Sequence, residues 1–332
     1  FDAPEAVAPI RELKAIEERL QDIPRQSFGE VAFVVSQRAL MFQAPKPGLH
    51  NATLLFFRNW HLSRMGAPFE QLLLDDLARS DLPAYKLYIL PNAFYLSEAQ
   101  RALIDRVVKR NGATALWIYA PGYLDDRTAS VDNMHALTGI HFGMEDVYAE
   151  LDVEVTDYQH PLTANLSRGF AYGTGVNREQ YMQPPKAEYM PETAVSPAFF
   201  AADDTVKVLG TARSTQRPGL VYKDFGTWRS LYSAAPLLPW RLLRSIARHA
   251  GVHLYDDGGD MLWGNNAFLA VYAQYAGEHT LHFPTAVTVD DAYEGTTLAT
   301  DVDTLTFEMA RWETKLLLTT PTQTGDEESS LS

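Results

Sequence analysis

Short apolar runs alternate with longer amphipathic stretches along the first part of the chain. Each apolar run stands between polar or turn residues, which predicts a buried strand. The strands are predicted at 31–35, 70–74, 87–90 and 115–119. In the stretches between, apolar residues recur every three or four positions, which predicts helices. The helices are predicted at 4–22, 49–65 and 97–110. This alternation is typical of a parallel sheet with helices on both faces.

The central unit of this pattern runs from Lys86 to Tyr123. Its first strand stops at Pro91-Asn92, and its second strand stops at Pro121-Gly122, so both strand ends carry turn chemistry. A helix that ends at Gly112 joins them, which makes one parallel βαβ unit. Because open α/β sheets build sites at the carboxyl ends of their strands, these two loops are where a site is expected.

After Tyr123 the pattern changes. Two helices are predicted, at 131–139 and 239–250, and a glycine stands at the C-terminal end of each, Gly139 and Gly251. We interpret the proline-containing tract 157–197 as an extended insertion or a β-rich edge, and not as a separate domain. A final strand–helix pair is expected to complete the α/β layer within 252–277. Alternating segments predict further strands at 147–155, 207–212, 220–222 and 230–233.

From His279 the alternation has the period of β-strands. Four or five short antiparallel strands are expected, which would make a small sheet or half-sandwich. The polar end of the chain is predicted to be disordered. The expected domains are an α/β domain at 1–275, a small β domain at 276–320 and a tail at 321–332.

The composition narrows the classes of partner. The chain of 332 residues has a formal net charge of −14, which argues against nucleic acid and anionic membranes. It has no apolar run long enough to cross a membrane and no signal-peptide pattern at Phe1. Because the sequence begins with Phe1 and not with Met, we expect the chain to begin inside a longer one. We expect a soluble protein, with the bacterial cytoplasm favoured.

The common catalytic motifs are missing from the sequence. Cysteine is absent, which excludes disulfides, thiolate metal sites and a cysteine nucleophile. No G-x-S-x-G, H-E-x-x-H or G-x-G-x-x-G motif occurs. The turn after the second central strand, Tyr119 to Gly122, offers neither Cys nor Ser, and a packing role for its tyrosine is favoured. We therefore expect no cofactor, no metal and no catalytic residue in this chain.

Two acidic pairs are the best candidates for ligand contact, because each follows a predicted strand. A glycosidase needs two carboxylates that face each other across a cleft. Neighbouring acids in a turn point in different directions, so turn formation and helix capping are the competing interpretation. The pairs are Asp75-Asp76 and Asp125-Asp126. The similar run from Asp256 to Asp260 lacks the ligand spacing of a calcium loop, and a plain turn is favoured there.

Three tryptophans are candidates for a surface that stacks on sugar rings or meets a partner subunit. Trp60 lies in a predicted helix, and Trp228 and Trp263 lie beside turns. Burial in a core or interface is the competing interpretation for all three. Trp117 lies within a predicted strand and is expected in the core.

Several stretches resemble the non-catalytic C-terminal region of large bacterial glycoside hydrolases, of the kind found in family 42 β-galactosidases. The resemblance implies an amidotransferase-like, flavodoxin-like α/β domain that mediates trimerisation, followed by a small β-sandwich. It also implies an upstream TIM barrel that carries the catalytic glutamates. The stretches are RMGAPFEQLLLDDL (64–77), YKLYILPNAFYLSEAQRALID (85–105), GATALWIYAPGYL (112–124), VDNMHALTGI (131–140) and RLLRSIARHAGVHLYDDGGDMLWGNNAFLAVY (241–272).

The resemblance implies an accessory and oligomerisation role in a β-galactosidase-like glycoside hydrolase. The matching stretches are hydrophobic framework, so no catalytic residue is carried over and this chain alone is not expected to be an enzyme. The implied partners are the upstream barrel, further copies of the chain, as in a trimer, and the carbohydrate substrate of the parent enzyme. The alternatives are a free-standing carbohydrate-binding protein and a sugar-active hydrolase that uses the strand-end carboxylates.

Overall fold

The computed structural model describes residues 4–23, 26, 29–43, 47–55, 57–176 and 194–322. The chain forms two compact units. The first, here called the β unit, comprises residues 1–28, 66–68 and 254–332. The second, the α/β unit, comprises 29–65 and 69–253. The predicted insertion and tail lie partly outside the described residues, at 177–193 and 323–332.

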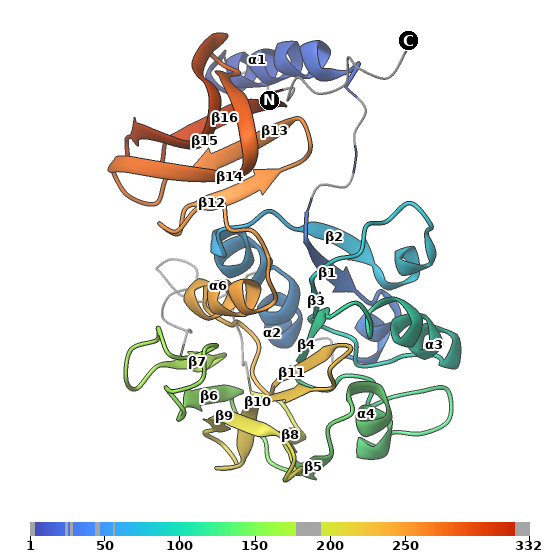
Figure 1. The fold of residues 1–332 in the computed structure, drawn as a ribbon. Coiled ribbons are helices and arrows are strands. Elements are labelled where there is room, and N and C mark those ends of the chain that lie inside the picture. Colours follow the sequence, from blue (N-terminus) through green and yellow to red (C-terminus); the bar gives the residue numbers. More distant parts are fainter. Residues whose placement is uncertain are drawn as a thin grey trace, which may run out of the picture. The chain divides into compact units, whose positions relative to one another are not determined.

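A nine-stranded mixed sheet organises the α/β unit (Figure 1). Five neighbouring strands pair in parallel, in the order β2 (Glu70–Leu73), β1 (Val31–Val35), β3 (Leu87–Leu90), β4 (Thr114–Ile118) and β11 (Arg229–Ser233). Four antiparallel strands continue the sheet, in the order β10 (Pro218–Asp224), β9 (Lys207–Ala212), β6 (Asp152–Val155) and β7 (Ala171–Gly173). A separate antiparallel pair joins β5 (Phe142–Glu145) to β8 (Ala198–Ala201).

The core of this unit lies along its central strands. Every residue of β1, β3 and β4 is buried, as expected of parallel strands covered on both faces. Trp117 is fully buried, and its indole Nε1 donates a hydrogen bond of 3.0 Å to Ser230 Oγ on β11. The predicted runs at 31–35, 87–90 and 115–119 therefore correspond to core strands, whereas the run at 70–74 forms the partly exposed edge strand β2, and Trp117 is a core residue.

Helices cover both faces of the sheet, with α2 (Pro47–His50) and α6 (Trp240–His249) on one side and α3 (Glu98–Val107) and α4 (Val131–Thr138) on the other (Figure 1). Helix α3 begins with a capping box, in which Ser97 and Gln100 each accept a hydrogen bond from the other's backbone N–H. Helix α4 ends at Gly139, which has a φ of 71°. The chain after α2 continues in irregular helical turns, Asn51–Leu55, Phe57–His61 and Leu62–Arg64.

A five-stranded antiparallel sheet forms the β unit, in the order β12, β13, β16, β14, β15. Helix α1 (Pro4–Leu20) belongs to this unit, where Arg19 Nη2 donates a hydrogen bond of 2.5 Å to the carbonyl of Ala292. The strands are β12 (Met261–Gly264), β13 (Phe268–Tyr272), β14 (Gly277–Asp291), β15 (Thr296–Met309) and β16 (Thr314–Pro321).

One prediction for the chain after α6 is wrong. The stretch expected to form a strand–helix pair instead forms the hairpin of β12 and β13, which pairs antiparallel within the β unit. The turn is fixed by Asn265, whose Oδ1 accepts hydrogen bonds from the backbone N–H groups of Ala267 and Phe268. The division into units also differs from the expected limit near residue 275, because the β unit takes in α1 and residues from Leu254 onward.

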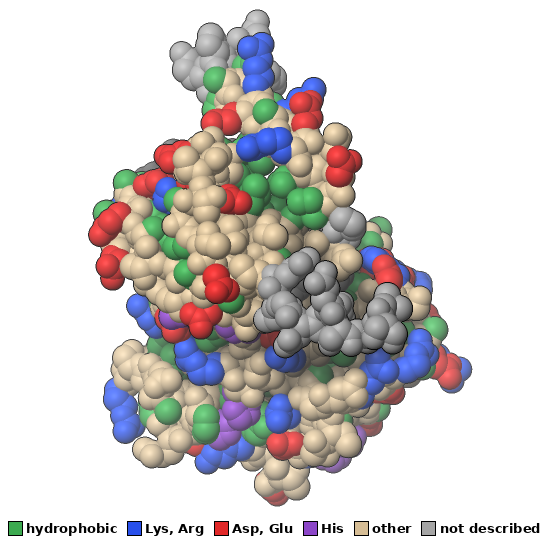
Figure 2. Space-filling view, turned by 45° about the horizontal axis from the view of Figure 1, so that its top comes forward, with side chains coloured by type: hydrophobic (Ala, Val, Ile, Leu, Met, Phe, Trp, Pro, Cys, Tyr) green, Lys and Arg blue, Asp and Glu red, His purple; other side chains and the backbone are tan. Residues whose placement is uncertain are grey.

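Charged side chains of both signs are interspersed on the face of the molecule drawn in Figure 2. The chain carries 28 basic and 42 acidic residues, so neighbouring charges of opposite sign reduce the repulsion that its net charge creates. Among the described residues, no helix has the length and apolar character needed to cross a bilayer.

Shortening a leucine in the central sheet tests the packing of the α/β unit. Leu116 on β4 is fully buried, so Leu116→Ala is expected to lower the free energy of unfolding by about 2–5 kcal/mol. Leu73→Ala is the matched control on β2, since that side chain is 37% exposed, and it is expected to cost about 1 kcal/mol or less. Urea denaturation measures both, and equal losses would contradict this core.

Candidate functional site

Three loops meet at the carboxyl ends of β1, β3 and β4. Asn92, after β3, is fully buried, and its side-chain amide makes two hydrogen bonds of 2.9 Å with the backbone of Ser36, after β1. The loop after β3 is joined to the loop after β4 by backbone bonds, among them Leu124 N to Phe94 O at 2.9 Å. The loops therefore form one connected surface at the place where this type of sheet builds sites.

Tyr119, the first residue after β4, has a backbone conformation that is rare for an aromatic residue. Its φ is 64°, in the left-handed region that glycine adopts without strain. Three hydrogen bonds hold it: its N–H donates to Ser233 O at 2.9 Å, its carbonyl accepts from Tyr232 Oη at 2.8 Å, and its hydroxyl donates to Pro197 O at 2.8 Å. Strain that the surroundings maintain in this way is frequent at functional sites.

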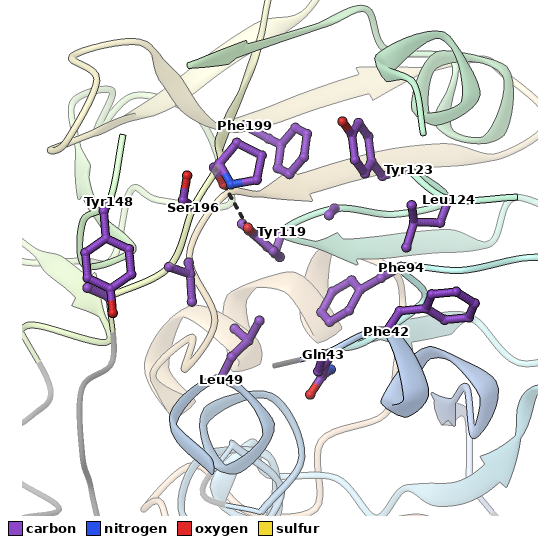
Figure 3. Close-up of a pocket in the computed structure, with 14 residues that line it drawn as sticks. Phe42, Gln43, Leu49, Phe94, Tyr119, Tyr123, Leu124, Tyr148, Ser196 and Phe199 are labelled. Carbon is purple, nitrogen blue, oxygen red and sulfur yellow. Dashed lines mark hydrogen bonds between the residues drawn. The ribbon is translucent and has the colours of Figure 1, made fainter. Parts of the chain in front are cut away.

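A cavity of about 420 Å³ opens beside Tyr119 (Figure 3). Aromatic rings form much of its wall. Phe94 and Phe199 both pack edge-to-face against Tyr119, with ring centroids 5.5 and 5.3 Å away. Phe42 and Tyr148 are half exposed and extend the aromatic wall toward solvent. The other lining residues are Gln43, Leu49, Ala120, Tyr123, Leu124, Ala194, Val195, Ser196 and Pro197.

The polar groups of this wall are few and mostly paired. Besides the Tyr119 hydroxyl, Ser196 Oγ donates to Asp146 Oδ1 at 2.9 Å, and Tyr123 Oη lies 3.5 Å from the sulfur of Met144. The amide Nε2 of Gln43 is buried and has no hydrogen-bond partner among the described residues. None of the described lining residues carries a charge.

The Tyr119 phenol is poorly suited to act as a nucleophile. Burial raises its pKa well above the ordinary value of a tyrosine, with the neighbouring Tyr123 adding to the rise. The phenol is therefore protonated at neutral pH, and its proton is held by the Pro197 carbonyl. The arrangement can bind a molecule, but the described wall offers neither a general base nor an activated nucleophile.

The first acidic pair has local structural roles. Asp75 Oδ1 accepts a hydrogen bond of 2.8 Å from the side chain of Gln100 in α3. Asp76 Oδ2 accepts one of 2.8 Å from the backbone N–H of Leu73, which caps the short 3-10 helix η5 (Leu74–Ala78). Neither acid is among the residues that line the cavity.

The second pair lies just beyond Leu124, which does line the cavity. Asp125 Oδ1 accepts hydrogen bonds from the backbone N–H groups of Arg127 and Thr128, at 2.8 and 2.7 Å, and these bonds lower its pKa. Asp126 accepts a hydrogen bond from the hydroxyl of Tyr95. Both carboxylates thus hold the loop, and neither lines the cavity.

The three tryptophans do not form a common platform on the α/β unit. Trp228 is only 8% exposed and stacks on Phe225 with a centroid distance of 4.7 Å. Trp60 is partly buried within the helical turn Phe57–His61. Trp263 is 39% exposed on β12, in the β unit. None of them lines the cavity.

The acidic run in the β unit forms a turn. The Asp256 carboxylate accepts hydrogen bonds from the backbone N–H groups of Gly258, Gly259 and Asp260. The buried carboxylate of Asp260 in turn lies 2.5 Å from Nδ1 of His279, which is also buried. In the described part of the chain, no three His, Asp or Glu side chains gather as a metal site would require.

The cavity residues could be found from the sequence only in part. The turn at Tyr119 is visible as a strand end with turn chemistry. The aromatic wall is not visible, because Phe42, Tyr148 and Phe199 are far apart in sequence and follow no motif. These three residues come together around the cavity only when the chain folds.

Comparison with known proteins finds solved structures with a similar fold but no curated protein that matches in sequence. No protein-family model and no curated protein matches the sequence. The chain superposes on the β-galactosidase of Bacillus circulans sp. alkalophilus with a TM-score of 0.61 and 15% identity. A cold-adapted β-galactosidase from Rahnella sp. R3 gives 0.62 and 14%, and a catalytic mutant of Gan42B, a GH42 β-galactosidase from G. stearothermophilus, gives 0.58 and 14%.

These superpositions cover nearly all of this chain and less than half of the others. They include 92–93% of this chain and 42–44% of the three β-galactosidases. At such low identity the likeness shows the fold alone. The structure is therefore mixed α/β, with a large sheet and a separate antiparallel sheet, and its fold is similar to that of a part of a GH42 β-galactosidase.

Removing the Tyr119 hydroxyl tests whether the phenol is buried and hydrogen-bonded to Pro197. Folding raises its pKa, so the protonated phenol contributes stability that is present below about pH 10 and is lost as the pH rises above it. Tyr119→Phe cannot ionise and is expected to lose less stability over that alkaline range. At neutral pH the variant should be about 1 kcal/mol less stable, since the bond to Pro197 is gone.

Urea denaturation at several pH values measures this difference. Tyr148→Phe is the matched control, because the Tyr148 side chain lines the same cavity and is 57% exposed. Parallel stability curves for the wild-type chain and Tyr119→Phe would show that the phenol is not held as described.

Proposed function

We propose that this chain is a non-catalytic accessory region of a β-galactosidase-like glycoside hydrolase. The observation that carries the proposal is the strand-end turn at Tyr119, where an amidotransferase-like enzyme would hold its nucleophile. Here the position holds a buried phenol that donates to Pro197. The likeness of the fold to part of three β-galactosidases supports the same interpretation.

The resemblance to family 42 β-galactosidases also suggests a role for each of the two units and the partners of the chain. The α/β unit would be an amidotransferase-like domain that mediates oligomerisation, as a trimer, and the β unit would correspond to the small β-sandwich. The partners would be an upstream TIM barrel and further copies of the chain. The superpositions cover only 42–44% of the β-galactosidase chains, which supports the idea that the catalytic region lies outside the part that this chain matches.

We do not propose the alternative, a hydrolase based on the strand-end carboxylates. A glycosidase needs two acids that face a shared cleft. Asp76 and Asp125 instead accept hydrogen bonds from backbone N–H groups of their own loops. Asp75 and Asp126 accept hydrogen bonds from the side chains of Gln100 and Tyr95.

The accessory role predicts no hydrolysis by this chain alone. The purified chain is expected to release no nitrophenol from nitrophenyl β-galactoside above the rate of buffer. The quadruple variant with Asn at the four acids named above is the matched control, and it should give the same background. Hydrolysis at the rate of a barrel-containing enzyme, lost in the quadruple variant, would contradict the proposal.

The oligomerisation role predicts that the purified chain self-associates. Light scattering at micromolar concentration is expected to give a mass of at least two chains, because large apolar side chains such as Met144 and Phe225, 45% and 38% exposed, favour burial in an interface. A monomer over the whole micromolar range would contradict this role and leave the hydrolysis result unaffected.

A further inference from the structure

The cavity at Tyr119 has the size and position of a ligand site. Protein interiors hold few voids larger than a water molecule. This cavity measures about 420 Å³, and pockets that hold small molecules measure about 300–1,000 Å³. It also lies at the carboxyl ends of β1, β3 and β4, where open α/β sheets bind their ligands.

The shape of the wall favours a flat apolar ring. Phe94, Tyr119 and Phe199 present neighbouring ring edges and faces, which Figure 3 shows on one side of the cavity. Phe42 adds a ring that stacks on Tyr95 at a centroid distance of 4.6 Å and is still 52% exposed. Aromatic rings bind other rings by offset stacking or edge-to-face contact, at low cost in conformational entropy.

The polar groups favour a neutral ligand with few hydrogen-bonding atoms. An ionised ligand would lose its hydration without meeting an opposite charge on the described wall. A sugar would find few donors for its hydroxyl oxygens, because the hydroxyls of Tyr119 and Ser196 already donate to Pro197 and Asp146. The amide of Gln43 is different, since its Nε2 is buried without a partner among the described residues.

We propose that this cavity binds a small neutral molecule that carries an aromatic ring and at least one hydrogen-bond acceptor. The ring packs against Phe94, Tyr119 and Phe199, and the acceptor meets the side-chain amide of Gln43. Phe42 and Tyr148 close the solvent side of the site. The inference does not depend on the proposed accessory role, because binding at this cavity requires neither hydrolysis nor self-association.

Calorimetry with the full chain tests the class of ligand. The probe is 4-methylumbelliferone, at a pH that keeps it neutral. One molecule per chain is expected to bind, with a Kd of about 10 μM to 1 mM for a ligand of this size. D-galactose, the second probe, is expected to give no binding. No binding of 4-methylumbelliferone, or binding of galactose alone, would overturn the proposal.

Three variants locate the binding. Phe42→Ala and Tyr148→Ala are each expected to weaken binding of 4-methylumbelliferone about ten-fold, because each removes a ring from the solvent side. Gln43→Leu keeps the size of the side chain and is expected to weaken it about five-fold. The matched control is Met41→Ala, whose side chain is 86% exposed and outside the lining, and which should bind as the wild-type chain does.

Unchanged affinity in all three cavity variants, or an equal loss in Met41→Ala, would overturn the site. A second copy of the chain could also cover the cavity, and light scattering distinguishes that outcome. If Tyr148→Ala converts an oligomer to monomers while the wild-type chain binds no 4-methylumbelliferone, the cavity is an interface and the ligand proposal fails.

Discussion

The left-handed turn at Tyr119 is the constraint on which the site depends. Its backbone is bonded to β11 through Ser233 and Tyr232, and its hydroxyl is bonded to the segment before β8 through Pro197. These bonds keep the backbone of an aromatic residue in a left-handed conformation that costs about 1–3 kcal/mol. Because β11 pairs in parallel with β4, the central sheet supplies the rigidity that keeps the turn in place.

This turn explains why the α/β unit has a pocket whose described wall offers no obvious catalytic group. The fold presents the residue after β4 at the strand-end surface, which is the position that would suit a nucleophile. The side chain there is a phenol whose pKa is raised by burial, and its neighbours Phe94 and Phe199 are apolar. The same geometry that could hold a reacting group instead forms one wall of a cavity.

The sequence predicted the layered part of the fold well, because its signals are local. The runs at 31–35 and 87–90 match β1 and β3, and the helix predicted at 97–110 matches α3. The hairpin of β12 and β13 was missed, since short apolar runs fit several architectures until their partners are known. The cavity was missed for the same reason, as its wall comes from segments that only tertiary structure brings together.

A crystal structure of the chain soaked with 4-methylumbelliferone is the most direct test of the central claim, that the Tyr119 turn frames a binding site without catalytic groups. We expect ring density against Phe94, Tyr119 and Phe199, an oxygen of the ligand within hydrogen-bond distance of Gln43 Nε2, and a positive φ at Tyr119. A cavity filled by the protein's own side chains, or a ligand bound only elsewhere, would contradict the account.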